Sequence, residues 1–294
     1  MLGAIVGDIV GSRFEWNNQK TKDFELFVKP ACRFTDDSVM TLAICEALLQ
    51  SKEDFSDLGK QDINWMKIYG RVFPSAGYGG MFTKWLISNN PQPYNSFGNG
   101  SGMRVSGCAY AANSLEEVKL LSKSVTEVTH NHPEGLKGAE AIAVATYLSL
   151  HGTSKEEIRE YITQNYYALD FTLDEIRADY DFDVTCQGSV PQALEAFFEA
   201  TSFEDAIRNA ISIGGDSDTI GAMTGSIAGA YYGVPSDIAE QALSFLDTRL
   251  VDTLVRFEKK YCKYEREHTL LLTKVFCILN RWIYKSIGFY FIMV

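Results

Sequence analysis

The sequence predicts an all-α fold, a compact orthogonal bundle of helices. Three observations support this prediction. Capping patterns that begin helices recur along the chain, few segments alternate apolar and polar residues as strands do, and no low-complexity linker or tandem repeat interrupts it. Of the 294 residues 46% are hydrophobic and 22% are charged, which is typical of a globular protein that buries a full core. We therefore expect one domain over residues 1–268 and an apolar tail over 269–294.

Two expected helices, one near residue 1 and one over 220–232, have an unusual glycine spacing. Glycine recurs at every fourth position in both, at Gly3, Gly7 and Gly11 and at Gly221, Gly225 and Gly229. Residues four apart lie on one helix face, and an interior glycine costs a helix up to about 1 kcal/mol relative to alanine. The glycines alone favour tight helix packing without any site. A second interpretation is that the two helices cross in the core and bring Glu15 together with Asp216 and Asp218.

The remaining helices are predicted by their start signals, taken in chain order. The apolar run 39–49 follows a cluster of hydroxyls and acids at 35–38, one of which is expected to be its N-cap. Pro133 opens an alanine-rich helix that runs through Leu150 and ends at Gly152. The turn-rich segment 73–106 is expected to be an inserted functional loop. Capping pairs predict four further helices, at Ser114 and Glu117, Thr153 and Glu156, Thr172 and Glu175, and Ser202 and Asp205.

Charge and cysteine content exclude several classes of function. The net charge is −11 and no block of Lys and Arg offsets it, so a polyanionic partner such as nucleic acid is excluded. A small anion is still allowed, because metal ions and backbone N–H groups can provide positive potential. The six cysteines are scattered without a C-x-x-C pair, which predicts reduced and mostly buried thiols. Asp8 and Arg13 interrupt the first apolar stretch, so we expect no secretory signal and a cytoplasmic protein.

The segment 269–294 is rich in large apolar residues but carries charged and polar ones. Lys274, Asn280, Arg281 and Lys285 leave no run of the ~18 apolar residues that a membrane-spanning helix needs. We expect a helix docked on the core or on a partner. The alternative is an amphipathic helix that contacts a membrane surface.

Two acidic clusters carry the predicted chemistry. Thr35-Asp36-Asp37-Ser38 precedes one helix and Gly214-Gly-Asp-Ser-Asp-Thr219 precedes another. Capping needs only one such residue, and adjacent carboxylates repel each other unless a cation neutralises them. Taken alone, the first cluster fits capping and function equally well. Hard oxygen ligands without His or Cys suit Mg²⁺, Mn²⁺ or Ca²⁺ rather than zinc, and two such clusters predict the binuclear centre of a two-metal hydrolase.

These clusters belong to an ordered set of motifs over residues 1–235. The set comprises Gly7-Asp8 with Glu15, Phe34-Thr-Asp-Asp-Ser38, Gly77-Tyr-Gly-Gly80, Gly98-Asn-Gly-Ser101 with Met103-Arg104, Thr129-His130, and Gly214-Gly-Asp-Ser-Asp-Thr-Ile-Gly221. In this order it resembles the ADP-ribosylglycohydrolases, which include hydrolases of ADP-ribosylated arginine, serine and dinitrogenase reductase. The resemblance implies the compact all-α fold of that family with two Mg²⁺ ions, or Mn²⁺ in their place.

The resemblance also implies residue roles. The implied metal ligands are Thr35, Asp36, Asp37, Asp216, Asp218 and Thr219, with Asp218 bridging the ions. The implied catalytic residues are Glu15, Asp36 and Asp218. The implied substrate-binding residues are Gly77, Tyr78, Gly79 and Gly80 for the diphosphate, Gly98, Asn99, Gly100 and Ser101 for the distal ribose and phosphates, and His130 for the adenosine end. The plainer interpretations are an exposed acid for Glu15, ordinary turns for the glycine loops, and structural roles for His130 and Arg104.

The implied activity is metal-dependent cleavage of the glycosidic bond between ADP-ribose and a modified protein side chain, which reverses ADP-ribosylation. Arginine-linked substrates are favoured, although segment 81–85, Met-Phe-Thr-Lys-Trp, lacks the acid that some relatives carry there for the guanidinium. The partner would be an ADP-ribosylated protein or another ADP-ribose conjugate. The alternatives are hydrolysis of a serine-linked or small-molecule conjugate, and a non-catalytic ADP-ribose-binding or structural relative. The intact acidic clusters argue against the non-catalytic alternative.

Overall fold

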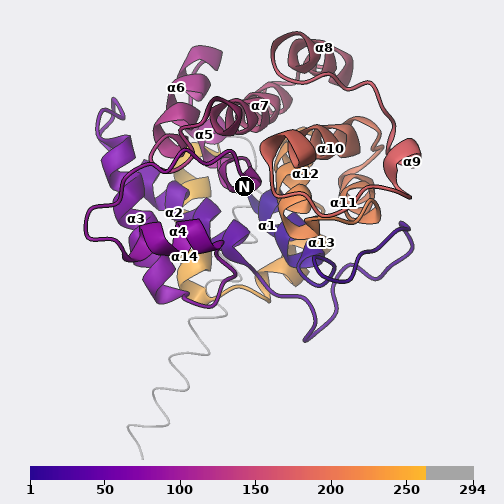
Figure 1. The fold of residues 1–294 in the computed structure, drawn as a ribbon, viewed down its shortest axis with the longest axis horizontal. Helices are drawn as coiled ribbons and strands as arrows, with labels where there is room; N and C mark the ends of the chain where they lie inside the picture. Colours follow the sequence, from indigo (N-terminus) through magenta and orange to yellow (C-terminus); the bar gives the residue numbers. More distant parts are fainter. Residues whose placement is uncertain (263–294) are drawn as a thin grey trace, which may run out of the picture.

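The computed structural model describes residues 1–262, and over this range it is helical without any strand, which confirms the all-α prediction (Figure 1). The predicted tail over 269–294 lies outside the described residues. The helices are α1 Leu2–Gly11, α2 Asp36–Gln50, α3 Leu58–Val72, α4 Gly80–Ile87, η1 Asn99–Ser101, α5 Gly107–Ala111, α6 Leu115–Thr126, α7 Pro133–Leu150, α8 Lys155–Asn165, α9 Leu173–Ile176, α10 Cys186–Phe198, α11 Phe203–Ser212, α12 Ser217–Tyr232, α13 Ser236–Leu243 and α14 Thr248–Tyr261.

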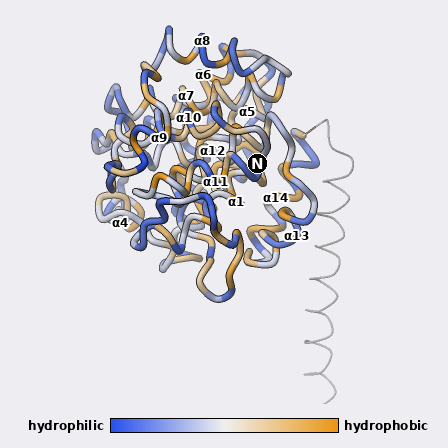
Figure 2. Tube along the Cα trace, turned by 90° about the vertical axis from the view of Figure 1, so that its right-hand side faces the viewer, coloured by the Kyte–Doolittle hydropathy of each residue, from blue (hydrophilic) through white to orange (hydrophobic). Residues whose placement is uncertain are grey.

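The crossing of α1 and α12 forms the centre of the molecule, and both helices lie near the middle of Figures 1 and 2. Every residue of α1 is buried. The glycines make the two backbones touch: a Cβ added to Gly7 would lie 1.9 Å from the Gly221 carbonyl oxygen, and one on Gly3 would lie 2.1 Å from that of Gly225. Because Gly11 faces Ser217 in the same way, the helices run antiparallel, and the end of α1 meets the start of α12.

The other helices surround this pair. α7, α10 and α11 pack on α12, while α2 contacts α1 and also packs on α3 and α14. In Figure 2 many hydrophilic positions lie toward the outside of the molecule, as expected for a globular fold around one core. None of the helices within residues 1–262 has the length and apolar content needed to cross a bilayer.

Most predicted helix starts are confirmed, and two predictions are wrong in detail. The N-cap side chains of Ser114, Thr172 and Ser202 accept from the expected backbone N–H groups, and α7 begins at Pro133. Helix α8 is capped by Ser154, whose partner is Glu157, so the pair predicted at 153 and 156 is off by one residue. The segment 73–106 is not a continuous loop, because it contains α4 and η1; its apolar residues Phe82, Trp85 and Leu86 are buried and stabilise α4.

The cysteines agree with the prediction of reduced thiols. Within the described residues Cys32, Cys45, Cys108 and Cys186 are free thiols, and all four are buried. Burial raises the pKa of the Cys45 and Cys108 thiols, which keeps them protonated.

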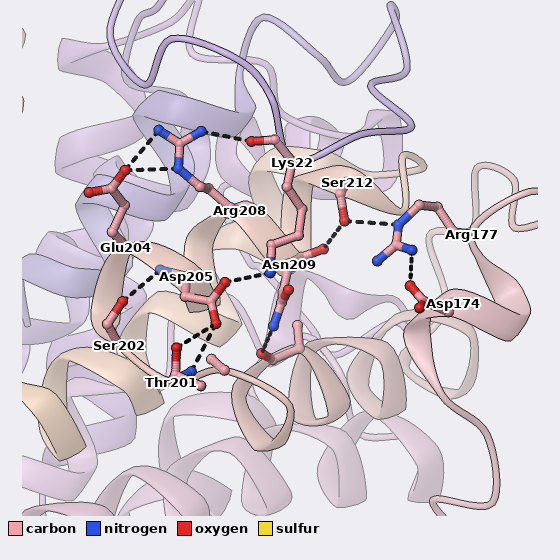
Figure 3. Close-up of polar contacts among 12 residues, drawn as sticks. Lys22, Asp174, Arg177, Thr201, Ser202, Glu204, Asp205, Arg208, Asn209 and Ser212 are labelled. Atoms are coloured by element: carbon pink, nitrogen blue, oxygen red, sulfur yellow. Dashed lines mark hydrogen bonds and ion pairs between the residues drawn. The ribbon is translucent and has the colours of Figure 1, made fainter.

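The loop that follows Glu15 is tied to α11. Lys22 forms an ion pair with Asp205, and the Arg208 guanidinium donates to the Lys22 carbonyl oxygen at 2.8 Å (Figure 3). Arg208 also donates to the Phe24 carbonyl oxygen at 2.7 Å. From the opposite side, Arg177 donates to the hydroxyl of Ser212 at 3.2 Å. The loop after α1 and the connection after α9 are therefore both held against α11. The first of them contains Glu15, a residue of the site described next.

Candidate metal centre

Two groups of acidic side chains share Asp218. Asp8, Asp37 and Asp218 form one group, and Glu15, Asp216 and Asp218 form the other. In each group one carboxylate oxygen per residue lies within 4.8 Å of the others, and all of these residues except Glu15 are buried. The structure therefore brings together four segments, from α1, the turn after it, the start of α2 and the start of α12. The interpretation that the glycine-faced helices bring Glu15 to Asp216 and Asp218 is confirmed.

The helix starts show which side chains of the two acidic clusters act as helix caps and which do not. Thr35 is the N-cap of α2, and its hydroxyl accepts from the Asp37 N–H at 3.3 Å. Capping therefore does not require the carboxylates of Asp36 and Asp37. Asp216 is the N-cap of α12 but makes no side-chain capping bond. Its carboxylate instead accepts from the Asn99 amide at 2.7 Å. The acids of both clusters thus exceed what the helix starts require.

Asp8 is a member of the centre that was not among the predicted ligands. Its carboxylate accepts from the N–H of Thr35 at 3.0 Å, the hydroxyl of Thr35 at 2.6 Å and the N–H of Ser38 at 3.1 Å, and it also bonds the Ser38 hydroxyl. It therefore fixes the start of α2 against α1. A signal was present in the sequence, because Asp8 is the one charged residue in the otherwise apolar and glycine segment of α1.

The donor set fits hard divalent cations. Every side chain in the two groups offers carboxylate oxygen, which Mg²⁺ and Mn²⁺ prefer. The buried Asp37 Oδ1 has no hydrogen-bond partner, although a buried acceptor without a partner is costly. A cation bound among these oxygens would satisfy it. Thr219, the sixth predicted ligand, is buried beside them at the start of α12.

The same crowding perturbs the titration of the carboxyls. Burial, and after it the charge of Asp8, raises the pKa of Asp36 to about 7. Burial and neighbouring carboxylates raise the pKa of Asp37 and of Asp218 well above the usual range. In metal-free protein these groups hold protons that a divalent cation would displace.

Glu15 is the partly exposed member of the centre. It lies in the turn after α1, and burial together with the charge of Asp216 raises its pKa, while Arg33 and a hydrogen bond from the Trp16 side chain lower it. A carboxyl with a raised pKa at the edge of a cluster can exchange a proton with a bound ligand. The interpretation of Glu15 as an exposed acid at a helix end is therefore wrong.

The loop from Gly98 to Ser101 lies next to Asp216, to which the Asn99 side chain bonds. The Asn99 N–H donates to the Val184 carbonyl at 2.8 Å. The Ser101 hydroxyl is buried and contacts the carbonyl oxygens of Gly98 at 3.1 Å and Gly135 at 2.9 Å, so this side chain holds the loop itself. Gly98 and Gly100 are partly exposed, which leaves their surface open toward a ligand.

His130 faces the same loop. A Cβ added to Gly98 or Gly100 would lie 3.6 Å from its Nε2 atom. Its Nδ1 atom lies 2.7 Å from the Thr129 hydroxyl, which accepts from the Arg104 guanidinium at 2.6 Å. Burial and the charge of Arg104 hold the pKa of His130 well below its usual range, so the imidazole is neutral. Arg104 is fully buried and electrostatically coupled to Asp62, which favours its structural interpretation.

The loop from Gly77 to Gly80 reaches the centre through Asp36. The Asp36 N–H donates to the Ala76 carbonyl at 2.9 Å, and a Cβ on Gly77 would lie 3.1 Å from Asp36 Oδ1. Gly77 also has a φ of 115°, which side chains rarely adopt. Nothing lies within 4 Å of a Cβ added to Gly79 or Gly80, so this loop is open to a ligand.

Comparisons with known proteins agree with this geometry. The chain is 27% identical to human ADP-ribosylhydrolase ARH3, with 80% of this chain and 84% of the relative covered. It is 26% identical to ADP-ribosylarginine hydrolase Tri1 of Pseudomonas putida, covering 80% and 70%, and 24% identical to ADP-ribosyl-[dinitrogen reductase] glycohydrolase of Rhodospirillum rubrum, covering 85% and 89%.

The structural match and the family match both name the ADP-ribosylglycohydrolases. A solved structure described as an ADP-ribosylglycohydrolase-related protein complex superposes with a TM-score of 0.61 at 23% identity, covering 83% of this chain and 95% of the other, and shows the shared fold. The family model described as ADP-ribosylglycohydrolase matches residues 1–266. The chain therefore belongs to the ADP-ribosylglycohydrolase family of enzymes, as its motifs predicted.

Proposed function

We propose that this protein hydrolyses the glycosidic bond between ADP-ribose and a modified protein side chain, with arginine-linked substrates favoured, and so reverses ADP-ribosylation. The observation that carries the proposal is the pair of acidic groups that share Asp218. The 98–101 loop is bonded to Asp216 through Asn99, and the 77–80 loop adjoins Asp36, the neighbour of Asp37. The relative from Pseudomonas putida is named for ADP-ribosylarginine, which supports the choice of linkage. A cytoplasmic location stays a prediction.

The proposed binuclear centre would hold two Mg²⁺ ions, or Mn²⁺, on a defined ligand set. The residues that would hold the ions are Thr35, Asp36, Asp37, Asp216, Asp218 and Thr219. Asp218 would serve both ions, and its membership of both carboxylate groups supports this role. Asp8 supports them, since its carboxylate is engaged by Thr35 and Ser38. When bound, the ions would supply positive charge and Lewis acidity at the ribose hydroxyls and the attacking water.

The chain's own residues would orient the substrate and move protons. The backbone N–H groups of 77–80 would bind the diphosphate. The loop 98–101 would contact the distal ribose and phosphates, with the neutral His130 at the adenosine end. Glu15, whose pKa burial raises, would hand a proton to the leaving group or take one from water. Asp36 and Asp218 would face the positive charge that develops on the ribose as the bond breaks.

The test is release of ADP-ribose from peptides that carry ADP-ribosylarginine or ADP-ribosylserine, with and without Mg²⁺. Wild-type protein should release ADP-ribose only with metal, and the Asp218→Ala variant should release none. Calorimetry with Mg²⁺ and with free ADP-ribose shows whether each is bound. Binding of both without release from any linkage would contradict a hydrolase and support an ADP-ribose-binding protein.

A further inference from the structure

An exposed aromatic pair lies at the edge of the acidic centre. The rings of Trp16 and Phe182 stack with their centroids 4.9 Å apart and their planes at 27°. Trp16 is 78% exposed and Phe182 is 38% exposed, so the stack leaves much of the indole open to solvent. Single exposed apolar residues need no explanation, whereas two large rings gathered at a functional centre indicate a binding surface.

Trp16 is directly connected to the acidic centre through Glu15. The two residues are neighbours in the chain, so the indole stands one position after the Glu15 carboxyl. Glu15 in turn lies with Asp216 and Asp218 in one carboxylate group. The aromatic pair is therefore on the Glu15 side of the centre, where the proposed proton transfer to the leaving group takes place.

The two loops that carry the rings are held together before any ligand binds. The Lys20 ammonium donates to the carbonyl oxygens of Tyr180 at 2.6 Å and Ile213 at 2.7 Å, and the Gly215 N–H donates to the Asn18 side chain at 3.0 Å. Both loops are also tied to α11, as Figure 3 shows for Lys22. A preorganised surface loses little conformational entropy on binding, so its contacts contribute to affinity.

The surroundings of the pair are acidic. Asp181 and Asp183 flank Phe182, and Asp181 is exposed. The loop lies close to the centre, because a Cβ added to Gly215, next to Asp216, would lie 3.2 Å from the Asp181 carbonyl oxygen. Two cations lie nearby. The Lys20 ammonium donates to two carbonyl oxygens, and the charge of Arg33 lowers the pKa of Glu15. A flat ring surface next to carboxylates is the combination that binds a guanidinium group.

We propose that Trp16 and Phe182 form a leaving-group platform, on which the guanidinium of a modified arginine stacks while Glu15 faces the bond to be cleaved. This inference rests on the proposed function and names the residues that would select the linkage. A serine side chain is short and uncharged, so it gains no cation–π contact from the platform. The platform therefore favours arginine-linked over serine-linked ADP-ribose.

The experiment compares the Trp16→Ala and Phe182→Ala variants with wild type in the presence of Mg²⁺. For an ADP-ribosylarginine peptide we expect each variant to raise KM about tenfold, which corresponds to about 1.4 kcal/mol, with kcat within twofold. For an ADP-ribosylserine peptide, and for the affinity of free ADP-ribose, we expect changes below twofold. Trp16→Phe should restore most of the loss, and Asp181→Asn should raise KM for the arginine linkage severalfold at low salt.

Leu120→Ala is the matched control, because Leu120 is 65% exposed on α6 and belongs to no part of the centre. Three results would overturn the platform. The first is an equal effect of the variants on both linkages. The second is a fall in kcat alone, which would mean that Trp16 acts only through Glu15, and the third is weaker binding of free ADP-ribose, which would assign the rings to the nucleotide. If wild type cleaves neither linkage, the proposed function fails. The platform is then judged by whether Phe182→Ala weakens binding of the arginine conjugate but not of free ADP-ribose.

Discussion

Replacement of Gly7 by alanine tests whether the contact between α1 and α12 builds the metal centre. The new Cβ would lie 1.9 Å from the Gly221 carbonyl oxygen and 2.7 Å from the Ala222 nitrogen, and both are backbone atoms that no rotamer change can move. The helices must therefore separate by roughly 1 Å, and overpacking of this kind costs up to about 3 kcal/mol. For a chain of this size that lowers the melting temperature by roughly 5 °C.

The same separation moves Glu15 and Asp8 away from Asp218, so Mg²⁺ affinity should fall at least about tenfold, as it does when the support of metal ligands is disturbed. The measurements are thermal unfolding with and without Mg²⁺ and calorimetric Mg²⁺ titration. Gly59→Ala in α3 is the matched control, because the nearest atom to its Cβ lies at 3.4 Å and the substitution should be neutral or slightly stabilising. A Gly7→Ala protein that melts within 2 °C of wild type and binds Mg²⁺ equally well would refute the reasoning.

Three further predictions concern the carboxylates. Asp218→Asn should abolish the rise in melting temperature that Mg²⁺ causes in wild type, because both groups lose the negative charge of their shared carboxylate; an unchanged rise would exclude Asp218 as a ligand. Asn99→Ala should weaken Mg²⁺ binding about 10–100-fold, since Asp216 loses the amide that orients it, and calorimetry measures this. Metal-free protein should lose stability as pH rises from 3.8 to about 7. Burial raises the pKa of Asp36 from 3.8 to about 7 on folding, so over this pH range the folded state binds more protons than the unfolded state. The loss is at most about 1.4 kcal/mol per pH unit for each titrating carboxyl, and chemical denaturation at several pH values with and without Mg²⁺ should show it only in the metal-free series.

Much of the site could be predicted because its residues stand at helix starts, where a short motif specifies both the backbone and the side chains that project from it. The cluster at Thr35 illustrates this: the hydroxyl caps α2, and the surplus carboxylates already indicated a cation. The glycine spacing predicted the close crossing of α1 and α12 for a similar reason, because the absence of side chains on one face is visible in the chain itself.

The role of Asp8 and the stack of Trp16 on Phe182 depended on contacts across the fold. Asp8 looked like an interruption of an apolar segment, and only the packing of α2 against α1 surrounds it with the donors of Thr35 and Ser38. Trp16 and Phe182 are 166 positions apart, and loops anchored by Lys20 bring them together. Periodicity and capping are local properties that can be identified in the order of residues. The pairing of distant loops depends on which buried surfaces fit together when the helices pack, so only the tertiary structure decides it.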